Sequence, residues 1–237
     1  MCDSTFARDK RAVLDARLCT FVNPYSYLKL RSNTDLLARF DAVGVDGISL
    51  CVFLKRVCGI DVPRLSFDMT SVGADVLAHA NEARRSIFLV GSKPHEVEAA
   101  RAVFAKRYPD IEFCGTHHGY LTAETKQQLI ADIVCRGPDI VICGMGSVSQ
   151  ERFLVELADA GWCGHGYTCG GFLHQTANGR IDYYPRWADA WHLRWLFRIF
   201  DEPRLFYRYA VEYPISFMCL AHDALVRNLD RQRVGGN

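Results

Sequence analysis

Short apolar strands that end at or beside a glycine alternate with helices in the middle of this chain, and this alternation constrains the fold more than any other feature. Apolar runs at 86–91 and 139–143 are typical of strands buried on both faces, and a further strand is predicted at 111–115. Helices are predicted between them at 96–108 and 123–136. Because parallel strands are joined by crossover helices of about a dozen residues, the sequence predicts an α/β fold with a Rossmann-like parallel sheet flanked by helices.

The segments on either side extend this pattern. A helix is predicted at 33–42 because Leu36, Leu37 and Phe40 share one helical face. The remaining elements are predicted strands at 19–22 and 166–169, helices at 48–57 and 71–83, and a helix that carries Gln150, Glu151 and Phe153. Together these elements predict an α/β core over residues 1–182, with room for two lobes.

Beyond residue 182 the composition changes to a mixture of tryptophan, tyrosine, phenylalanine and arginine. This mixture is typical of a helix in a membrane interface, so we predict a membrane-associating helical appendage over residues 183–237. Its cations for lipid phosphates or an anionic membrane surface would be Arg198, Arg204 and Arg208. A C-terminal helix packed on its own sheet explains the same composition about equally well.

Charge and cysteine content narrow the classes of function. A formal net charge of +1 produces no overall basic field, so a nucleic-acid partner is not expected. No run reaches the roughly 18 apolar residues needed to span a bilayer, and the first residues mix acids and bases unlike a signal peptide. The ten cysteines form no CxxC pair, which predicts no metal site. We therefore expect a cytoplasmic protein whose membrane contact is peripheral.

The loops after the predicted strands should meet at one edge of the sheet, because ligands of such folds bind beyond the carboxyl ends of the strands. Gly144 and Gly146 resemble a phosphate-binding turn, although neither GxGxxG nor a Walker lysine is present. Gln150 is a candidate ligand for a base or a sugar, whereas Glu151 is expected only to complement the helix dipole. The loop that contains Gly171 would border the same crevice.

Other polar residues near that edge are candidates for chemistry. Asp46 lies in an otherwise apolar stretch, where an unpaired carboxylate is costly to bury, which makes it a candidate general base. A surface Asp-Gly turn explains Asp46 as well. His117 and His118 follow Thr116 at a strand end, and neighbouring side chains there point in opposite directions, so at most one of the two histidines should face the crevice.

Taken in order, these segments resemble the WecG/TagA/CpsF family of glycosyltransferases, which add a second sugar to saccharides linked to polyprenyl diphosphate. The likeness runs from about residue 21 to about residue 208. Its most specific pieces are Val45-Asp-Gly47, the segment 108–120 that ends in Gly-Thr-His-His-Gly-Tyr, Gly146-Ser-Val-Ser-Gln-Glu151, Gly170-Gly171, Pro185-Arg-Trp187, and the segments 195–198 and 202–204.

The resemblance implies an inverting transfer from a UDP-sugar donor onto a lipid-linked saccharide acceptor, without a metal ion or other cofactor. Asp46 matches the proposed base of the family, and Asn23 matches the asparagine of a Thr-x-Asn motif near the donor. The nucleotide site would be lined by Gly144, Gly146 and Gln150, with Thr116 and His118 nearby. Arg64 and the arginines of the appendage would stabilise the leaving diphosphate. The appendage would hold the protein on the inner face of the cell membrane.

Departures from the family pattern leave the donor sugar open. Phe21 stands where the threonine of Thr-x-Asn is usual, Val148 replaces a proline, and His174 falls where the family has a different sequence after its glycine pair. N-acetylmannosamine, glucose and a uronic acid remain possible sugars. Two other classes also remain open: a different nucleotide-sugar enzyme such as an epimerase or dehydrogenase, and a noncatalytic module that binds a sugar nucleotide or a membrane.

Overall fold

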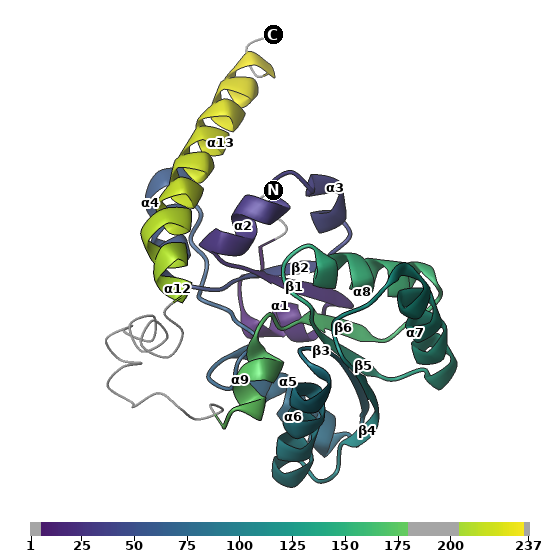
Figure 1. The fold of residues 1–237 in the computed structure, drawn as a ribbon. Coiled ribbons are helices and arrows are strands. Elements are labelled where there is room, and N and C mark those ends of the chain that lie inside the picture. Colours follow the sequence, from purple (N-terminus) through teal and green to yellow (C-terminus); the bar gives the residue numbers. More distant parts are fainter. Residues whose placement is uncertain (1–5, 180–203, 235–237) are drawn as a thin grey trace.

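The structure, a computed structural model, describes residues 6–179 and 204–234, with side chains in the second range from 206 to 226 (Figure 1). Six parallel strands form one sheet in the order β2-β1-β6-β5-β3-β4. Their bounds are β1 Leu18–Val22, β2 Ala42–Val45, β3 Ser86–Gly91, β4 Glu112–His117, β5 Ile140–Gly144 and β6 His165–Thr168. Every strand pairing is parallel, which confirms the α/β class and the Rossmann-like sheet.

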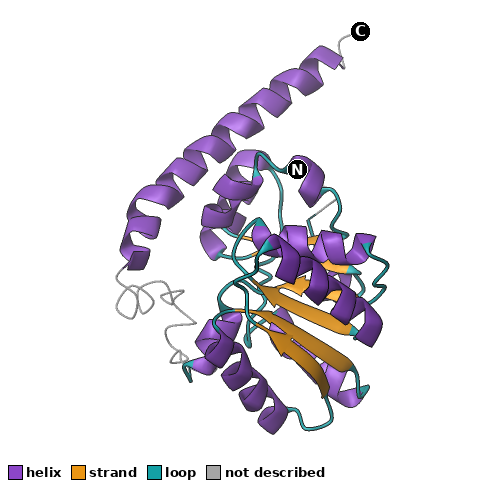
Figure 2. Ribbon diagram, turned by 45° about the vertical axis from the view of Figure 1, so that its right-hand side comes forward, coloured by secondary structure: helices purple, strands orange, loops and turns teal. Residues whose placement is uncertain are grey.

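Helices cover both faces of this sheet, as Figure 2 shows. In chain order they are α1 Lys10–Leu14, α2 Pro24–Leu30, α3 Thr34–Leu37, α4 Ile48–Cys58, α5 Val72–Glu82, α6 Pro94–Arg107, α7 Ala123–Arg136, α8 Ser149–Asp159 and α9 Phe172–Ala177. Alternate residues of β3 point to opposite faces of the sheet. Ile87 and Leu89 pack in a cluster with α5 and α6, whereas Phe88 and Val90 pack in a second cluster with α7 and α8. Both faces of the strand are therefore buried, which explains its continuous apolar sequence.

The helix predicted at 33–42 is wrong in its extent. Only Thr34–Leu37 is helical, and the Asn33 side chain makes no capping hydrogen bond. Ala42 instead begins β2, whose residues pair with β1 in the register Cys19 to Ala42. The carboxylate of Asp41 accepts a hydrogen bond of 2.8 Å from the backbone N–H of Leu18, which holds the two strand starts together. Pairing with a neighbouring strand thus outweighs the local helical pattern.

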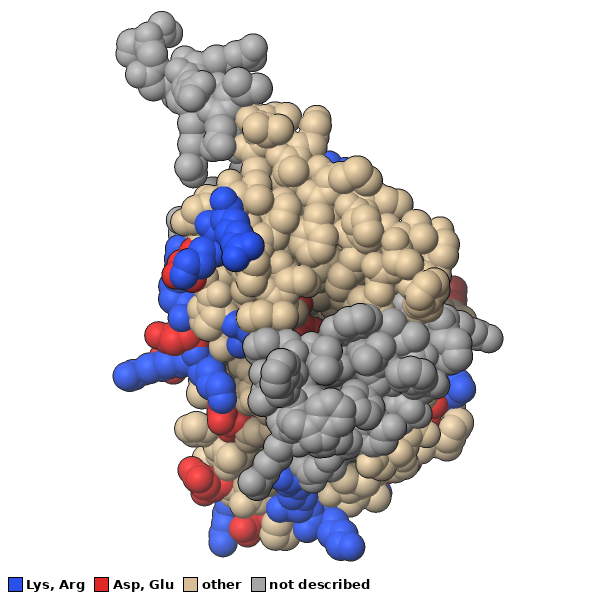
Figure 3. Space-filling model, turned by 90° about the vertical axis from the view of Figure 1, so that its left-hand side faces the viewer, with Lys and Arg blue, Asp and Glu red and all other residues tan. Residues whose placement is uncertain are grey.

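The C-terminal part of the described chain is helical and rests on the core. It consists of α12 Arg204–Tyr207, a π-helical turn η2 Arg208–Glu212, and the long helix α13 Tyr213–Val234. Phe217 of α13 packs on Phe53 of α4 with ring centroids 5.1 Å apart. Asp223 binds Arg31 at the end of α2 at 2.6 Å. Figure 1 shows α13 continuing well past the core, and Figure 3 shows a broad uncharged surface on this side of the molecule with charged groups at its margin.

Candidate functional site

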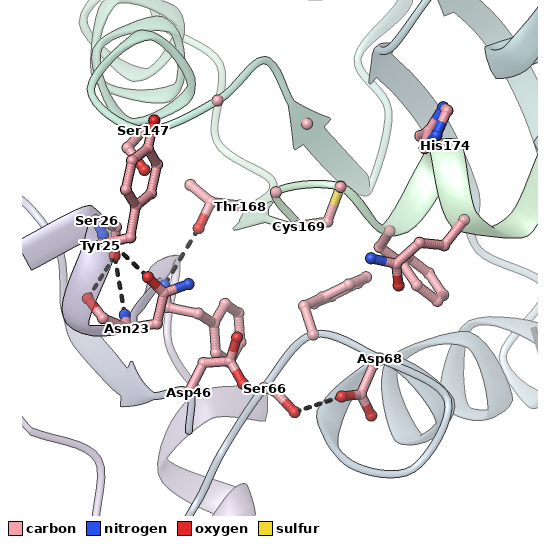
Figure 4. A pocket seen from close by; sticks show the side chains of 18 of the residues that line it. Asn23, Tyr25, Ser26, Asp46, Ser66, Asp68, Ser147, Thr168, Cys169 and His174 are labelled. Carbon is pink, nitrogen blue, oxygen red and sulfur yellow. Dashed lines mark hydrogen bonds between the residues drawn. The ribbon is translucent and has the colours of Figure 1, made fainter. Parts of the chain in front are cut away.

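A cavity of about 1400 Å³ lies beyond the carboxyl ends of the strands, where the topology of the sheet predicts a ligand site. It is bordered by the loops that follow all six strands, with Tyr120 from the loop after β4, and by residues of η2. Figure 4 shows this cavity from close by. The residues predicted from sequence that line it are Asn23, Asp46, Arg64, Gly144, Gly146, Gln150, Gly171 and Arg208. Segments that are distant in the sequence therefore share one hollow.

Thr116 and His118 are not among the described residues that line this cavity. They lie at and just after the end of β4, one of the two edge strands of the sheet, whereas Tyr120 in the loop after β4 does line the cavity. The Thr116 hydroxyl donates a hydrogen bond to Glu98 of α6 instead. Among the predicted membrane cations, Arg198 lies outside the described residues, and so does the side chain of Arg204.

Asp46 lies beside a cationic side chain at the cavity wall. Its backbone N–H donates to the carbonyl of Val22 at 2.8 Å, which places it directly after β2. Nη2 of Arg64 lies 3.5 Å from Oδ1 of Asp46 and 2.8 Å from Oδ2 of Asp68. Burial acts to lower the pKa of Arg64, but the two carboxylates raise it, so the guanidinium remains cationic. One arginine is thus shared between two acids.

Asp68 is held by more donors than Arg64 alone. The Ser66 hydroxyl donates to it at 2.7 Å, and the backbone N–H of Thr70 donates at 2.8 Å. Burial acts to raise the pKa of Asp68, but Arg64 and these hydrogen bonds outweigh burial and lower it. Sequence reasoning did not select Asp68, although it lies between Phe67 and Met69 in the same kind of apolar setting that singled out Asp46.

Asn23 has a structural role as well as a place at the site. Its side-chain oxygen accepts a hydrogen bond of 2.9 Å from the backbone N–H of Ser26 and caps the start of α2. This bond fixes the amide, and Figure 4 shows its nitrogen directed into the cavity near Asp46. Asn23 can therefore donate a hydrogen bond to a ligand oxygen there.

Backbone geometry requires glycine both at the last residue of β5, Gly144, and in the turn that follows it, at Gly146. A Cβ at Gly144 would lie 2.7 Å from the carbonyl oxygen of Gly170, which is too close for any side chain. Gly146 has a φ of +84°, in the left-handed region that favours glycine. Both positions leave bare backbone at the cavity, next to the N-terminus of α8. Such a turn can accommodate an anion.

Glu151 does more than complement the helix dipole, which was its expected role. Its side chain is fully buried and accepts hydrogen bonds from Thr20, Gln150 and the backbone N–H of Val148. The neighbouring Gln150 is also buried and lines the cavity. The carbonyl oxygen of its side chain accepts from the backbone N–H of Gly170 at 3.2 Å.

Two further contacts lie at the far ends of the cavity, and sequence reasoning missed their residues Tyr25, Lys29 and Glu96. At one end, the Arg208 guanidinium lies 3.9 Å from the centre of the Tyr25 ring, and the ammonium of Lys29 binds the Tyr25 hydroxyl. At the other end, Nδ1 of His174 lies 2.9 Å from the buried carboxylate of Glu96. In the sequence, the four-residue spacing between Tyr25 and Lys29 is the signal that could have indicated the first of these contacts. The cavity thus combines carboxylates, cations and bare backbone donors, a set suited to an anionic ligand and a proton transfer.

The chain is similar to known proteins over most of its length. A family model described as the glycosyl transferase WecG/TagA/CpsF family matches residues 4–230. A UDP-Gal:alpha-D-GlcNAc-diphosphoundecaprenol beta-1,4-galactosyltransferase of Shigella boydii is 34% identical over 195 residues, which cover 82% of this chain and 81% of that protein. An N-acetylglucosaminyldiphosphoundecaprenol N-acetyl-beta-D-mannosaminyltransferase of Bacillus subtilis (strain 168) is 25% identical over 194 residues, 77% of this chain and 70% of that protein.

Proposed function

The chain belongs to the WecG/TagA/CpsF family of glycosyltransferases, and from this we propose that it moves a hexose from a UDP-sugar onto a saccharide linked to polyprenyl diphosphate. Membership in the family confirms the resemblance seen in the sequence. The names of both relatives describe acceptors in which N-acetylglucosamine is joined to undecaprenyl diphosphate. The product would be a lipid-linked intermediate of a cell-surface polymer. An epimerase or dehydrogenase and a noncatalytic module become the less favoured readings.

The observation that carries the proposal is the position of Asp46 in the cavity wall, 3.5 Å from Arg64. We assign to Asp46 the role of general base. Its carboxylate takes the proton of the acceptor hydroxyl while that oxygen attacks the anomeric carbon of the donor sugar. The bond between the anomeric carbon and the diphosphate oxygen breaks, and UDP leaves with the electron pair. Attack opposite the leaving group inverts the anomeric centre.

Stabilisation of the departing UDP falls to fixed donors and cations in this proposal. Arg64 offers a partly buried positive charge, and the bare turn around Gly146 offers backbone N–H groups at the start of α8. Asn23 and Gln150 would contribute hydrogen bonds from side-chain amides. We propose that these groups stabilise the charge without a metal ion.

A membrane-facing surface would bring the lipid-linked acceptor to this cavity. Several large apolar side chains of the C-terminal helices are exposed: Phe206, Tyr207, Ile215, Met218, Leu225 and Val226. Ile48 and Val52 of α4, the helix that packs on α13, are exposed as well. We propose that residues 183–237 form an appendage to a core of residues 1–182 and rest on the inner face of the cell membrane, with Arg208 near lipid or acceptor phosphates. Within the described part of the chain, no helix has both the length and the apolar character needed to cross a bilayer.

The test is a transfer assay with a small panel of donors. UDP-galactose, UDP-N-acetylmannosamine and UDP-glucose would each be offered with N-acetylglucosamine linked to a prenyl diphosphate, in detergent or liposomes. UDP-galactose is the first donor to try, because a relative 34% identical is named for it. We expect one donor to give product that disappears in Asp46→Asn. No product from any donor, with folded protein and a proven acceptor, would contradict the proposal.

A further inference from the structure

The most completely buried acid at the cavity edge is not the proposed base but Glu151. Its side chain has 0% exposure and reaches from α8 to Thr20 in the middle of β1. Oε1 accepts hydrogen bonds of 2.9 Å from the Thr20 hydroxyl and 2.9 Å from Nε2 of Gln150. Oε2 accepts one of 2.6 Å from the backbone N–H of Val148. Burial raises the pKa of Glu151, and these three donors oppose that effect by favouring the carboxylate.

This arrangement allows only one orientation of the Gln150 amide. The backbone N–H of Gly170 can only donate, so the group of Gln150 that faces it at 3.2 Å must be the carbonyl oxygen. The carboxylate of Glu151 can only accept, so the group that faces it must be the NH₂. Partners on both sides therefore demand the same orientation, and one N–H and one lone pair of the amide are left for another partner.

The same carboxylate also holds the turn that follows β5. Val148 has a φ of +74°, which is strained for a β-branched residue and needs support from its surroundings. The hydrogen bond from its N–H to Glu151 supplies that support directly. Through Gln150, Glu151 is further connected to Gly170, in the loop after β6 that also lines the cavity. One buried acid thus sets the relative position of two loops that line the cavity.

We infer that Glu151 is a positioning residue that holds the Gln150 amide and the turn at 144–148 in the geometry that binds the UDP portion of the donor. The inference rests on the proposed function, since it concerns the nucleotide end of that same site. Glu151 acts through Gln150 and the backbone and need not touch the ligand. Gln150 then presents a fixed N–H to an oxygen of the uracil or diphosphate.

Glu151→Gln is the sharpest test because it changes polarity with little change in shape. The amide at position 151 must turn its oxygen to the Val148 N–H, so its NH₂ faces the NH₂ of Gln150. Rotating the Gln150 amide only moves the conflict, because its NH₂ would then face the N–H of Gly170. One donor always opposes another, so the loops have to shift.

Binding of UDP, measured by calorimetry on the full chain, gives a readout separate from turnover. We expect Glu151→Gln to weaken UDP binding by about tenfold or more, the scale of one lost hydrogen bond with its displaced loop. Thr20→Val is the matched control. It removes one donor to the same carboxylate but leaves the Gln150 contact, so UDP affinity should stay within about twofold of the parent even if Tm falls.

Two more variants keep the test decisive if Glu151→Gln does not fold. Glu151→Asp keeps the charge but is too short to reach both Val148 and Gln150, and should fold while UDP affinity drops. The exchange Gln150→Glu with Glu151→Gln restores donor–acceptor matching along the chain of bonds, so it should regain most of the Tm that Glu151→Gln loses.

The outcomes separate the inference from the function on which it rests. Parental UDP affinity in both single Glu151 variants would overturn the inference alone. A parent protein that binds no UDP would overturn the proposed function and the inference together. Weaker UDP binding in the Glu151 variants, with Thr20→Val unaffected, would support the positioning role over a general loss of stability.

Discussion

Nη2 of Arg64 lies 3.5 Å from Oδ1 of Asp46, so the proposed base contacts the arginine that is proposed to bind the diphosphate. The same nitrogen is 2.8 Å from Asp68, which holds it more closely. Arg64 is therefore anchored by one acid while it stays near the other. This relationship makes the acidic cluster, rather than any single residue, the unit on which the proposed chemistry depends.

Replacing the base should abolish most transfer while the fold survives. We expect Asp46→Asn to reduce kcat by about 10²- to 10⁴-fold, because general-base assistance contributes that much to proton removal from a hydroxyl. Asp61→Asn is a suitable control, since Asp61 is exposed and pairs with Lys55 on the surface. Activity of Asp46→Asn near that of the control would remove Asp46 from its role.

Arg64 should be sensitive to shape as well as charge. We expect Arg64→Gln to lower kcat by about 10²- to 10³-fold, the usual loss when a group that stabilises transition-state charge is removed. Arg64→Lys should recover only part of that loss, because a single ammonium lacks the planar fork of a guanidinium. Steady-state rates at saturating donor distinguish these cases. Full activity in Arg64→Lys would show that charge alone suffices.

Transfer should not depend on a divalent ion if fixed protein groups stabilise the departing UDP. We expect the rate to be unchanged, within about twofold, after dialysis against EDTA and on addition of magnesium or manganese. The assay is the one used to identify the donor. A rate that falls with EDTA and returns with one metal would contradict this part of the proposal.

The contact between α13 and α2 should depend on pH. Asp223 accepts hydrogen bonds from Arg31 at 2.6 Å and from Tyr27 at 2.5 Å. The hydrogen bond from Arg31 is the main cause that lowers the pKa of Asp223 to about 2, below the ordinary value of about 3.9 for an aspartate. A depressed folded-state pKa means that the stabilisation is complete above about pH 4 to 5 and is lost as the pH falls toward 2.

Comparison with Asp223→Asn tests this dependence. The difference in free energy of unfolding between parent and variant should be constant from about pH 5 upward and shrink between about pH 4 and pH 2. Denaturant unfolding at several pH values measures it. A difference that does not change with pH would mean that the carboxylate charge is unimportant for holding α13.

The exposed apolar side chains of α13 should matter for membrane binding. We expect Met218→Glu combined with Leu225→Glu to weaken binding to anionic liposomes by about tenfold or more, given the free energy of burying such side chains. Ala131→Glu on α7 adds the same kind of charge elsewhere and should bind like the parent. Equal binding of all three proteins in a sedimentation assay would favour the alternative in which the helix only packs on its own core.

The central part of the fold could be predicted because its signals are local. Ser86–Gly91 and Ile140–Gly144 are buried on both faces, so their sequences are apolar throughout and end at glycines that the neighbouring backbone requires. The short strand β2 could not be predicted in this way. Ala42–Val45 has only four residues, and it is a strand because β1 lies beside it.

The candidate site likewise combines features that the sequence predicts with features that depend on tertiary packing. Loops after parallel strands had to meet at one sheet edge, which is why Asp46, Gly144 and Gln150 share a cavity. Which side chains of a loop face the cavity depends on tertiary packing, so Thr116 and His118 were grouped with them although Thr116 bonds Glu98 and Tyr120 lines the cavity instead. The catalytic and binding roles of all these residues stay predictions until they are measured.

The sequence by itself determined the α/β class, the family and the residues most suited to chemistry, because apolar periodicity, glycine positions and short motifs are properties of neighbouring residues. Only the tertiary structure decided which partners those residues have. Glu151 was expected only to complement the helix dipole, but it is fully buried and accepts three hydrogen bonds. Asp68 was not selected as a site residue, yet it anchors Arg64. Burial and hydrogen bonding depend on segments that lie 18 to 148 positions apart, such as Arg64 with Asp46 or Thr20 with Thr168, and folding alone brings these together.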